Sequence, residues 1–208
     1  KYLYKLDPES INVAARNGCH PIHLAIAGIK HRKEKPEIAI EMVQFLLDCD
    51  SNVALQPYQD RLPLCWFCEI ENEIDLARLN AALKVLQILY DAHPEVIESD
   101  EVTSNLGEFG TESHEFVSTH LAYARQARDR APMTTRDENG QLPLHKALRD
   151  NVNLGSIKLL VKGNPSAISC ADNTGMIPLH VACQHHESAA VVDYLIGLDS
   201  IAFRATDF

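Results

Sequence analysis

Two stretches of the chain carry one pattern: residues 137–148 read DENGQLPLHKAL, and residues 172–183 read DNTGMIPLHVAC. Asp, Gly, Pro, Leu, His and Ala recur in the same order, and each matched pair lies 35 residues apart. A fixed period of about 20 to 50 residues is typical of a repeat array, in which each repeat is one supersecondary unit. The stretch from Asp137 to Cys183 therefore predicts a chain built from repeats.

The residue types in this pattern fit a turn followed by a helix. Asp and then Gly favour a tight turn, because Gly tolerates a positive φ. Pro143 suits the first turn of a helix, where its missing N–H would have no partner. Leu144, Ala147 and Leu148 follow at helical spacing, so they form one apolar face.

The pattern extends toward the N-terminus. A helix start of the same kind begins at Pro21, and a degenerate one begins at Pro63. The link before each turn is repeated as well, since Pro8 precedes Gly18 by ten residues and Pro165 precedes Gly175 by ten. Most of the chain therefore follows the repeat.

This pattern resembles the ankyrin repeat, whose motif is a turn with Asp and Gly followed by Thr-Pro-Leu-His-x-Ala. The resemblance implies an all-α fold, an ankyrin-like helix-turn-helix solenoid with short β-turn or hairpin tips. One departure concerns the Thr before Pro, because a hydroxyl there could cap the helix. We expect poorer caps here and stacking that depends more on apolar contact. The residues in the place of that Thr are His20, Leu62, Leu142 and Ile177.

The repeats predict a single array over residues 1–208. Its third repeat is degenerate: Glu98 to Glu115 is acidic and turn-rich, part of it is expected to be disordered, and a long atypical helix is expected from Thr111 to Arg130. The residues before Asp7 resemble the end of an earlier repeat, so we expect a fragment of a longer array. The predicted repeats lie near 12–55, 57–97, 98–136, 137–171 and 172–205.

Charge and cysteine content restrict the classes of partner. The net charge is −10 at pH 7, whereas nucleic acids and anionic membrane surfaces attract basic segments, so we expect neither partner. A protein partner with a basic patch is favoured. No apolar run reaches the roughly 18 residues that a membrane span needs. The six cysteines do not form a dense disulfide scaffold, which favours a reducing intracellular compartment, cytoplasmic or nuclear.

Cys65 and Cys68 form the strongest enzymatic candidate. A C-x-x-C at a helix start can lower a thiol pKa, which suits a dithiol redox site or half of a zinc site. A zinc site needs four ligands, however, and a redox fold needs a βαβ setting, and neither is visible in the sequence. We favour the alternative that both cysteines are core neighbours on one helix.

Histidines are the second group that could carry chemistry. His23, His145 and His180 share one slot in three repeats. In the resembled family this His bonds the backbone of adjacent turns, so we expect a structural role rather than a metal ladder. His185 and His186 are expected in a solvated loop between helices.

The resemblance implies a non-enzymatic protein-interaction scaffold that binds a partner through the concave face of the array. We expect a monomer with no cofactor and no metal. Two alternatives stay open: a dithiol or metal-binding role at Cys65 and Cys68, and a regulatory arm of a larger enzyme outside this chain. The expected partner-binding residues are Arg16, Asn17, Cys19, Tyr58, Gln59, Arg61, Glu138, Asn139, Gln141, Arg149, Asp150, Asn173, Thr174, Met176, Gln184 and His185.

Overall fold

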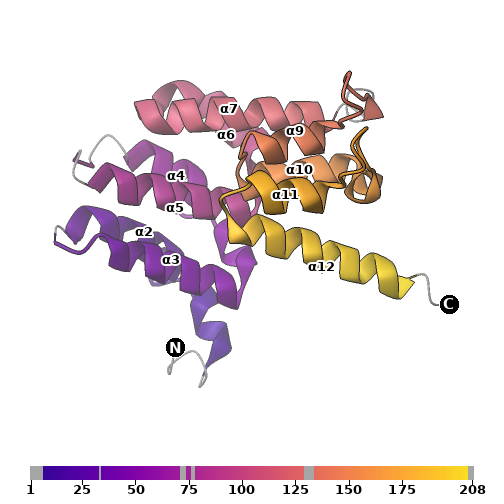
Figure 1. Cartoon of the computed structure of the whole chain (residues 1–208). Helices are drawn as coiled ribbons and strands as arrows, with labels where there is room; N and C mark the ends of the chain where they lie inside the picture. Colours follow the sequence, from indigo (N-terminus) through magenta and orange to yellow (C-terminus); the bar gives the residue numbers. More distant parts are fainter. Residues whose placement is uncertain (1–6, 33, 71–73, 76–77, 129–133, 206–208) are drawn as a thin grey trace. The chain divides into compact units, whose positions relative to one another are not determined.

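The computed structural model describes residues 7–32, 34–70, 74–75, 78–128 and 134–205, which form helices joined by turns with no strand among them (Figure 1). This confirms the all-α class. The chain divides into two compact units, unit 1 (residues 1–119) and unit 2 (residues 120–208). That the repeats of both units form one array stays a prediction. Residues 1–6, expected to end an earlier repeat, lie outside the described part.

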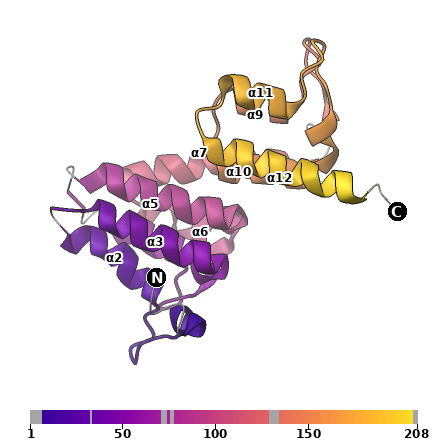
Figure 2. The same ribbon diagram turned by 60° about the horizontal axis from the view of Figure 1, so that its bottom comes forward.

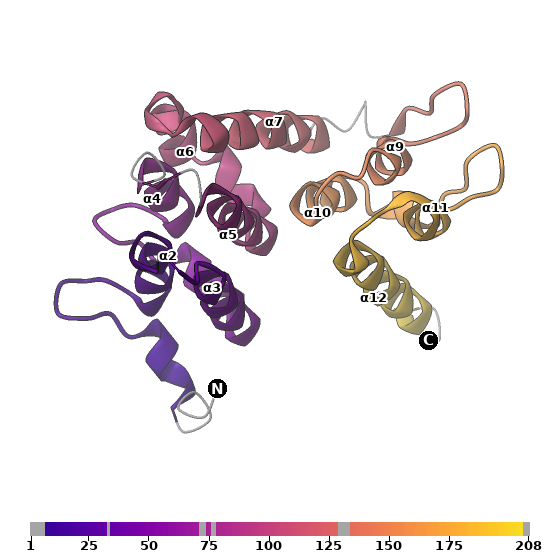
Figure 3. The ribbon, with the colours of Figure 1, turned by 60° about the vertical axis from the view of Figure 1, so that its left-hand side comes forward.

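Unit 1 contains two helix pairs. The first is α2 (Pro21–His31) with α3 (Glu37–Cys49), and the second is α4 (Pro63–Ile70) with α5 (Leu79–Ala92). In Figure 3, α2 lies beside α4 and α3 beside α5, so first helices and second helices form separate layers. The links that lead into the following repeats are the 3-10 helices η1 (Pro8–Asn12), η2 (Ser51–Leu55) and η5 (Pro94–Glu98).

Apolar side chains at helical spacing hold these pairs together. Ile22, Ile26 and Ile29 of α2 are buried, and so are Val85 and Leu86 of α5. Residues three or four positions apart lie on the same helix face, so each helix buries one stripe against its neighbours. The pairing therefore depends on apolar contact, as the sequence predicted.

Arg78, immediately before α5, adds a polar connection between the two pairs. Its Nε and Nη2 donate to Asp75 Oδ1 and Oδ2 at 2.8 and 2.7 Å. Its Nη1 donates to Ile29 O at 3.1 Å and also to Lys30 O. These carbonyls belong to the last turn of α2 and have no partner within that helix. Arg78 thus caps α2 from the neighbouring pair.

Unit 1 continues into a helix that the sequence did not predict. α6 (Asp100–Asn105) and η6 (Leu106–Glu108) occupy the stretch for which turns and partial disorder were predicted, so that prediction is wrong for these residues. Ser99 caps α6 by accepting a hydrogen bond from Val102 N at 3.3 Å. Pro8 precedes the next helix start by 13 residues, but α6 begins six residues after Pro94. The turn between link and helix is therefore absent from this degenerate repeat.

Unit 2 begins within α7 (Thr111–Arg128), the helix predicted from Thr111, whose last two predicted residues lie outside the described part. In Figure 2, α9 lies beside α11 and α10 beside α12. α10 approaches α7 closely at Gly163, where a Cβ atom would collide with the carbonyl of Ala127. The remaining elements are α9 (Pro143–Arg149), α10 (Leu154–Gly163), η7 (Pro165–Ser169), α11 (Pro178–His185) and α12 (Ala189–Ala205).

Candidate functional site

The turns before α9 and α11 have the same internal hydrogen bonds, and we name them the tips of unit 2 (residues 137–141 and 172–176). In the first tip, Asp137 N donates to Gln141 O at 3.0 Å, and Gly140 N donates to Asp137 O at 2.9 Å. The second tip repeats both bonds at 3.0 Å. Gly140 and Gly175 have φ of 71° and 84°, the left-handed region that favours glycine.

A carboxylate anchors each of these tips. Asp137 Oδ1 accepts two backbone N–H groups of its own tip, at 2.9 and 2.8 Å. Asp172 Oδ1 accepts from Thr174 Oγ1 at 2.6 Å, from Thr174 N at 2.8 Å and from Met176 N at 3.0 Å. These bonds, that of the Thr174 hydroxyl first, lower the pKa of Asp172 to about 2. The Asp172 carboxylate is therefore ionised in the folded tip at neutral pH.

The two tips are also bonded to each other. Asn173 N donates to Asn139 O at 3.0 Å, and Asn173 Nδ2 donates to Glu138 O at 3.2 Å. Arg136 Nη1 donates to Gly140 O at 2.6 Å and to Ala171 O at 2.7 Å. The tips therefore form one connected edge, visible as two adjacent orange loops in Figure 2.

His145 fastens the first helix of its repeat to the next tip. Its Nδ1 accepts from Leu142 N at 3.2 Å, which serves as a cap where the family's Thr is missing. Its Nε2 lies 3.1 Å from Cys170 O and 3.2 Å from Met176 O. The buried imidazole thus bonds the backbone of two successive repeats, as predicted for this slot.

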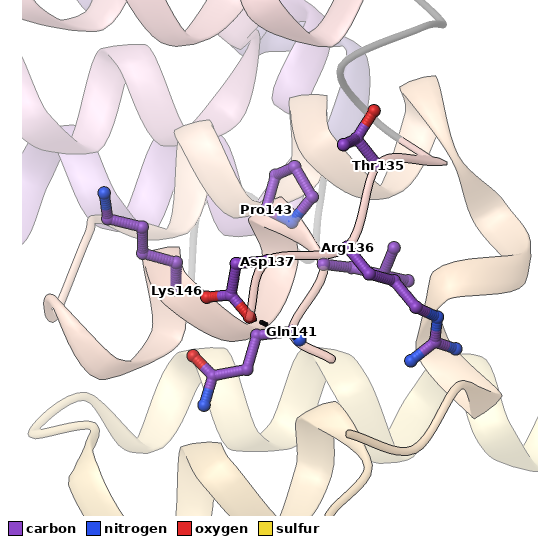
Figure 4. Close-up of a pocket in the computed structure, with 7 residues that line it drawn as sticks. Thr135, Arg136, Asp137, Gln141, Pro143 and Lys146 are labelled. Carbon is purple, nitrogen blue, oxygen red and sulfur yellow. Dashed lines mark hydrogen bonds between the residues drawn. The ribbon is translucent and has the colours of Figure 1, made fainter. Parts of the chain in front are cut away.

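A pocket of about 410 Å³ lies beside the first tip of unit 2 (Figure 4). Leu142 and Pro143 give it an apolar wall, and Lys146 and Asp137 place charged groups beside it. A pocket of this size can receive one large side chain. The lining residues are Thr135, Arg136, Asp137, Gln141, Leu142, Pro143 and Lys146.

Gln141 connects this pocket to the second tip. With its amide oriented so that Oε1 faces Arg149, it accepts from Nη1 and Nη2 of that residue at 3.0 and 2.8 Å. Its amide nitrogen then faces Asp172, and this hydrogen bond contributes to the lowered pKa of Asp172. Arg149, Gln141 and Asp172 thus form a chain of polar contacts across two repeats.

A family model for ankyrin repeats, with three copies, matches residues 112–207. This part of the chain contains ankyrin repeats. The match covers both tips of unit 2 and the helices that follow them, and no curated protein and no solved structure matches the chain. Among the described residues, none of the helices has the length and apolar content needed to cross a membrane.

The first ankyrin-like tip of unit 1 keeps the backbone of the unit 2 tips but loses the carboxylate. Ala15 N donates to Cys19 O at 2.9 Å, and Gly18 N donates to Ala15 O at 2.8 Å. Ala15 stands where unit 2 has Asp, so only Asn17 Oδ1 accepts a backbone N–H here, from Cys19 at 3.1 Å. This tip therefore has fewer internal bonds.

The second tip of unit 1 has a different backbone, and we name it the hairpin (residues 58–61). Tyr58 and Arg61 exchange two backbone hydrogen bonds of 2.9 and 3.0 Å. Gln59 and Asp60 have φ of 52° and 60°, which is the pair of positive angles that a two-residue hairpin turn requires. This turn replaces the Asp and Gly of the ankyrin tip.

The ankyrin His slot also differs between the units. His145 meets the prediction of a bond to an adjacent turn, whereas His180 Nδ1 bonds only its own Ile177 N–H, at 3.2 Å, among the described contacts. His23 has no hydrogen-bond partner on either ring nitrogen and packs on aromatic rings. The prediction of a backbone bond is therefore wrong for His23.

Most of the residues predicted to bind a partner lie at the surface. Cys19 and Gln141 are the exceptions, with 6% and 7% of their surface exposed, so they act through the turn and the side chains that they hold. The structure brings together the predicted residues of the two unit 2 tips, and it places Arg149 beside Gln141. The role of the whole set in binding stays a prediction.

Sequence reasoning missed a column on the first helices. The residue three positions after the starting Pro is Leu24 in α2, Trp66 in α4 and Lys146 in α9. Leu24 is 61% exposed, Trp66 is half-buried and Lys146 is exposed. The spacing from Pro gives an outward side chain in these three helices only, because Val181 at the same position of α11 is buried.

The cysteine pair and the histidines were the two groups that could carry chemistry, and the structure shows the surroundings of both. Cys65 and Cys68 have 0% exposure, and a buried thiol is poorly placed for redox chemistry. Within the described residues, no three His, Cys, Asp or Glu side chains are grouped as a metal site. His186, predicted in a solvated loop, instead bonds Val152 O through Nε2 at 2.9 Å and Ser188 N through Nδ1 at 3.1 Å.

Proposed function

We propose that this chain is a non-enzymatic scaffold that binds a protein partner through the tips and the outward faces of the first helices. Ankyrin repeats in general mediate protein–protein interactions. The observation that carries the proposal is the hydrogen-bonded edge formed by the tips of unit 2. The backbone and the side chains of Asp172 and His145 make its internal bonds.

This arrangement leaves side chains available for a partner. Glu138 and Asn139 are exposed at the edge, while their backbone is fixed by the tip bonds. A surface that is ordered before binding loses less conformational entropy when the partner arrives. The pocket beside Lys146 offers a place for one anchoring side chain, and such anchors dominate the energy of most interfaces.

The charge distribution supports a basic partner, with unit 1 as the attracting part. Unit 1 holds 20 Asp and Glu against 10 Lys and Arg, and unit 2 holds nine of each, so the net charge of −10 belongs to unit 1. A charged patch accelerates association with a partner of opposite sign. We also propose a monomer in a reducing compartment, cytoplasmic or nuclear; the compartment is supported by the six cysteines, none of which forms a disulfide within the described part of the chain.

Site-specific photo-crosslinking tests the proposal. A photoreactive residue is placed at Asn139 or at Thr174 in the full chain, and the matched control carries it at Lys162, an exposed residue of α10. We expect the same partner to be crosslinked from both tip positions and not from Lys162. Glu138→Arg with Asn139→Arg should then weaken that complex at least about tenfold at unchanged melting temperature. Crosslinks confined to Lys162 would reject the proposed surface.

A further inference from the structure

His23 is fully buried in α2, and neither of its ring nitrogens has a hydrogen-bond partner. Nearly all buried polar groups in native proteins are hydrogen-bonded, so two unpartnered atoms on one ring need an explanation. His145 occupies the same slot, two residues after the starting Pro, and uses both of its nitrogens. The difference therefore comes from the neighbours of the ring and not from its position in the repeat.

The neighbours of His23 are aromatic rings. The ring centroid of Tyr58 lies 5.4 Å away, and that of Trp66 lies 5.7 Å away in an edge-on arrangement. Tyr58 and Trp66 also contact each other, with centroids 6.2 Å apart. In unit 2 the following tip offers carbonyl oxygens to His145, whereas here the hairpin offers the ring of Tyr58.

The charged groups around His23 do not favour a proton on it. On α2, His20 lies with its ring centroid 6.0 Å away and would carry a charge of the same sign. The hairpin and α4 present the uncharged rings of Tyr58 and Trp66, and Glu101 of α6 is bonded to Leu62 N at 2.9 Å. Burial first, and then the charge of His20, lower the pKa of His23 to about 4, while the backbone of His20 raises it in part and no carboxylate contributes.

We propose that His23 and the hairpin form an acid-sensitive latch: protonation of His23 breaks its packing on Tyr58 and Trp66 and releases the hairpin from α2. An imidazolium has two N–H donors, and in the closed arrangement neither ring nitrogen has a hydrogen-bond partner of good geometry. The backbone of His20 favours the charged form, but burial outweighs this contribution. Release of the hairpin gives both donors access to water. The latch is a property of unit 1 alone, so it does not depend on the proposed function. The hairpin carries Tyr58, Gln59 and Arg61, so its release would also change part of the proposed interaction surface.

The sign of the effect follows from the two protonation equilibria. In the open state His23 titrates near its ordinary pKa of 6.5, and in the closed state the pKa falls to about 4. The closed state is therefore fully favoured above pH 6.5 and loses stability as the pH falls from 6.5 toward 4. At pH 5 the ratio of closed to open hairpin should be about 30-fold lower than at pH 8.

Trp66 is the only tryptophan of the chain, so its emission reports on the latch. We would follow the full chain from pH 8 to pH 4.5 by Trp66 emission, by hydrogen exchange of the Tyr58 and Arg61 amides, and by NMR titration of His23. We expect a shift in Trp66 emission and a His23 pKa well below 6.5. After correction for the intrinsic effect of pH on amide exchange, the Tyr58 and Arg61 amides should exchange up to about 30-fold faster at acidic pH. A His23 pKa of 6.5 or higher, with both amides still protected at pH 5, would overturn the proposal.

Two variants separate the latch from general acid effects. His23→Leu should abolish the change in Trp66 emission, and the matched control His145→Leu should leave it intact. His20→Asn should move the transition to higher pH, because it removes a charge of the same sign from beside His23. A transition that is unchanged in His23→Leu would also overturn the proposal. If His23→Leu does not fold, the NMR titration of the wild-type chain decides.

Discussion

The two units are built from similar helix pairs but differ in the hydrogen bonds that hold their turns. In unit 2 each tip has an Asp carboxylate and a Gly with positive φ, and His145 joins one repeat to the next tip. In unit 1 the first tip has Ala15 in place of Asp, and the hairpin has neither residue in its family position. The helices of unit 1 still pack in pairs, so apolar contact is sufficient for pairing, and the hydrogen bonds of the unit 2 turns add to it.

The difference also explains the extent of the family match. The ankyrin model matches residues 112–207, where the fastening residues are present. Most of unit 1 lies outside this range although it keeps the paired helices. A family is thus detected by its turn chemistry, whereas a fold can persist on the apolar pattern alone.

The largest expected effect tests whether both units depend equally on apolar contact. Ile26 in α2 and Leu148 in α9 are both fully buried. Ile26→Ala and Leu148→Ala should each cost about 2 to 5 kcal/mol, because each leaves a cavity in its unit. Denaturant unfolding, followed by Trp66 emission for unit 1 and by hydrogen exchange for unit 2, measures both. Leu24→Ala, at an exposed site on α2, is the control. If either core variant lost less than about 1 kcal/mol of stability, the two units would not depend equally on apolar contact.

A second pair of variants tests the His slot. His145→Leu should destabilise unit 2 by about 1 to 3 kcal/mol, because it leaves the Leu142 N–H and two carbonyls without their partner. His23→Leu at pH 8 should be neutral or stabilising, because it removes unpartnered polar atoms from the core of unit 1. The same unfolding measurements apply. Equal losses for the two variants would show that His23 has bonds in solution that this structure lacks.

A third pair compares the tips. Gly18→Ala should cost about 1 kcal/mol from the positive φ alone, since a Cβ there meets nothing within 4 Å. Gly140→Ala should cost more, because its Cβ would also collide with the Asn173 side chain and lie 3.0 Å from Asn173 N. Thermal melting compares them directly. A larger loss of stability for Gly18→Ala than for Gly140→Ala would mean that the hydrogen-bonded edge of unit 2 accommodates an added Cβ more easily than its close contacts suggest.

The smallest effect concerns acid stability of the second tip. Because the pKa of Asp172 is lowered to about 2 from an ordinary value of 3.8, its contribution is present above pH 3.8 and is lost as the pH falls from 3.8 to 2. Hydrogen exchange of the Thr174 and Met176 amides should therefore accelerate in that interval. Asp172→Asn should remove this pH dependence, and a profile that is the same in the variant would contradict it.

The sequence predicted the features that follow from period and residue type. The 35-residue step, the helix starts at Pro and the apolar faces were all visible, because each depends on neighbours in the chain. Three features depended on distant residues and could not be predicted. Arg78 caps a helix about 50 residues earlier, α6 forms in a stretch that had lost its motif, and His23 packs on rings from the next repeat.

The candidate surface was predicted in outline for a similar reason. Turn positions such as Asn139 and Thr174 are fixed by the motif, so their exposure could be expected from the sequence. Gln141 and Cys19 share one motif position with Arg61 and Met176, which are half-buried, and local packing buries Gln141 and Cys19 almost completely. Leu24, Trp66 and Lys146 share one spacing from Pro, but this spacing alone does not predict exposure, because Val181 at the same position of α11 is buried.

The bond from Asn173 N to Asn139 O joins main chain to main chain. Such a joint does not depend on which side chain residue 139 carries, so the contact residues at 138 and 139 can be exchanged while the edge between repeats persists. Substitutions at these positions can therefore change binding specificity while the hydrogen-bonded main chain is retained. A library randomised at these two positions should yield new binders that keep the parental melting temperature.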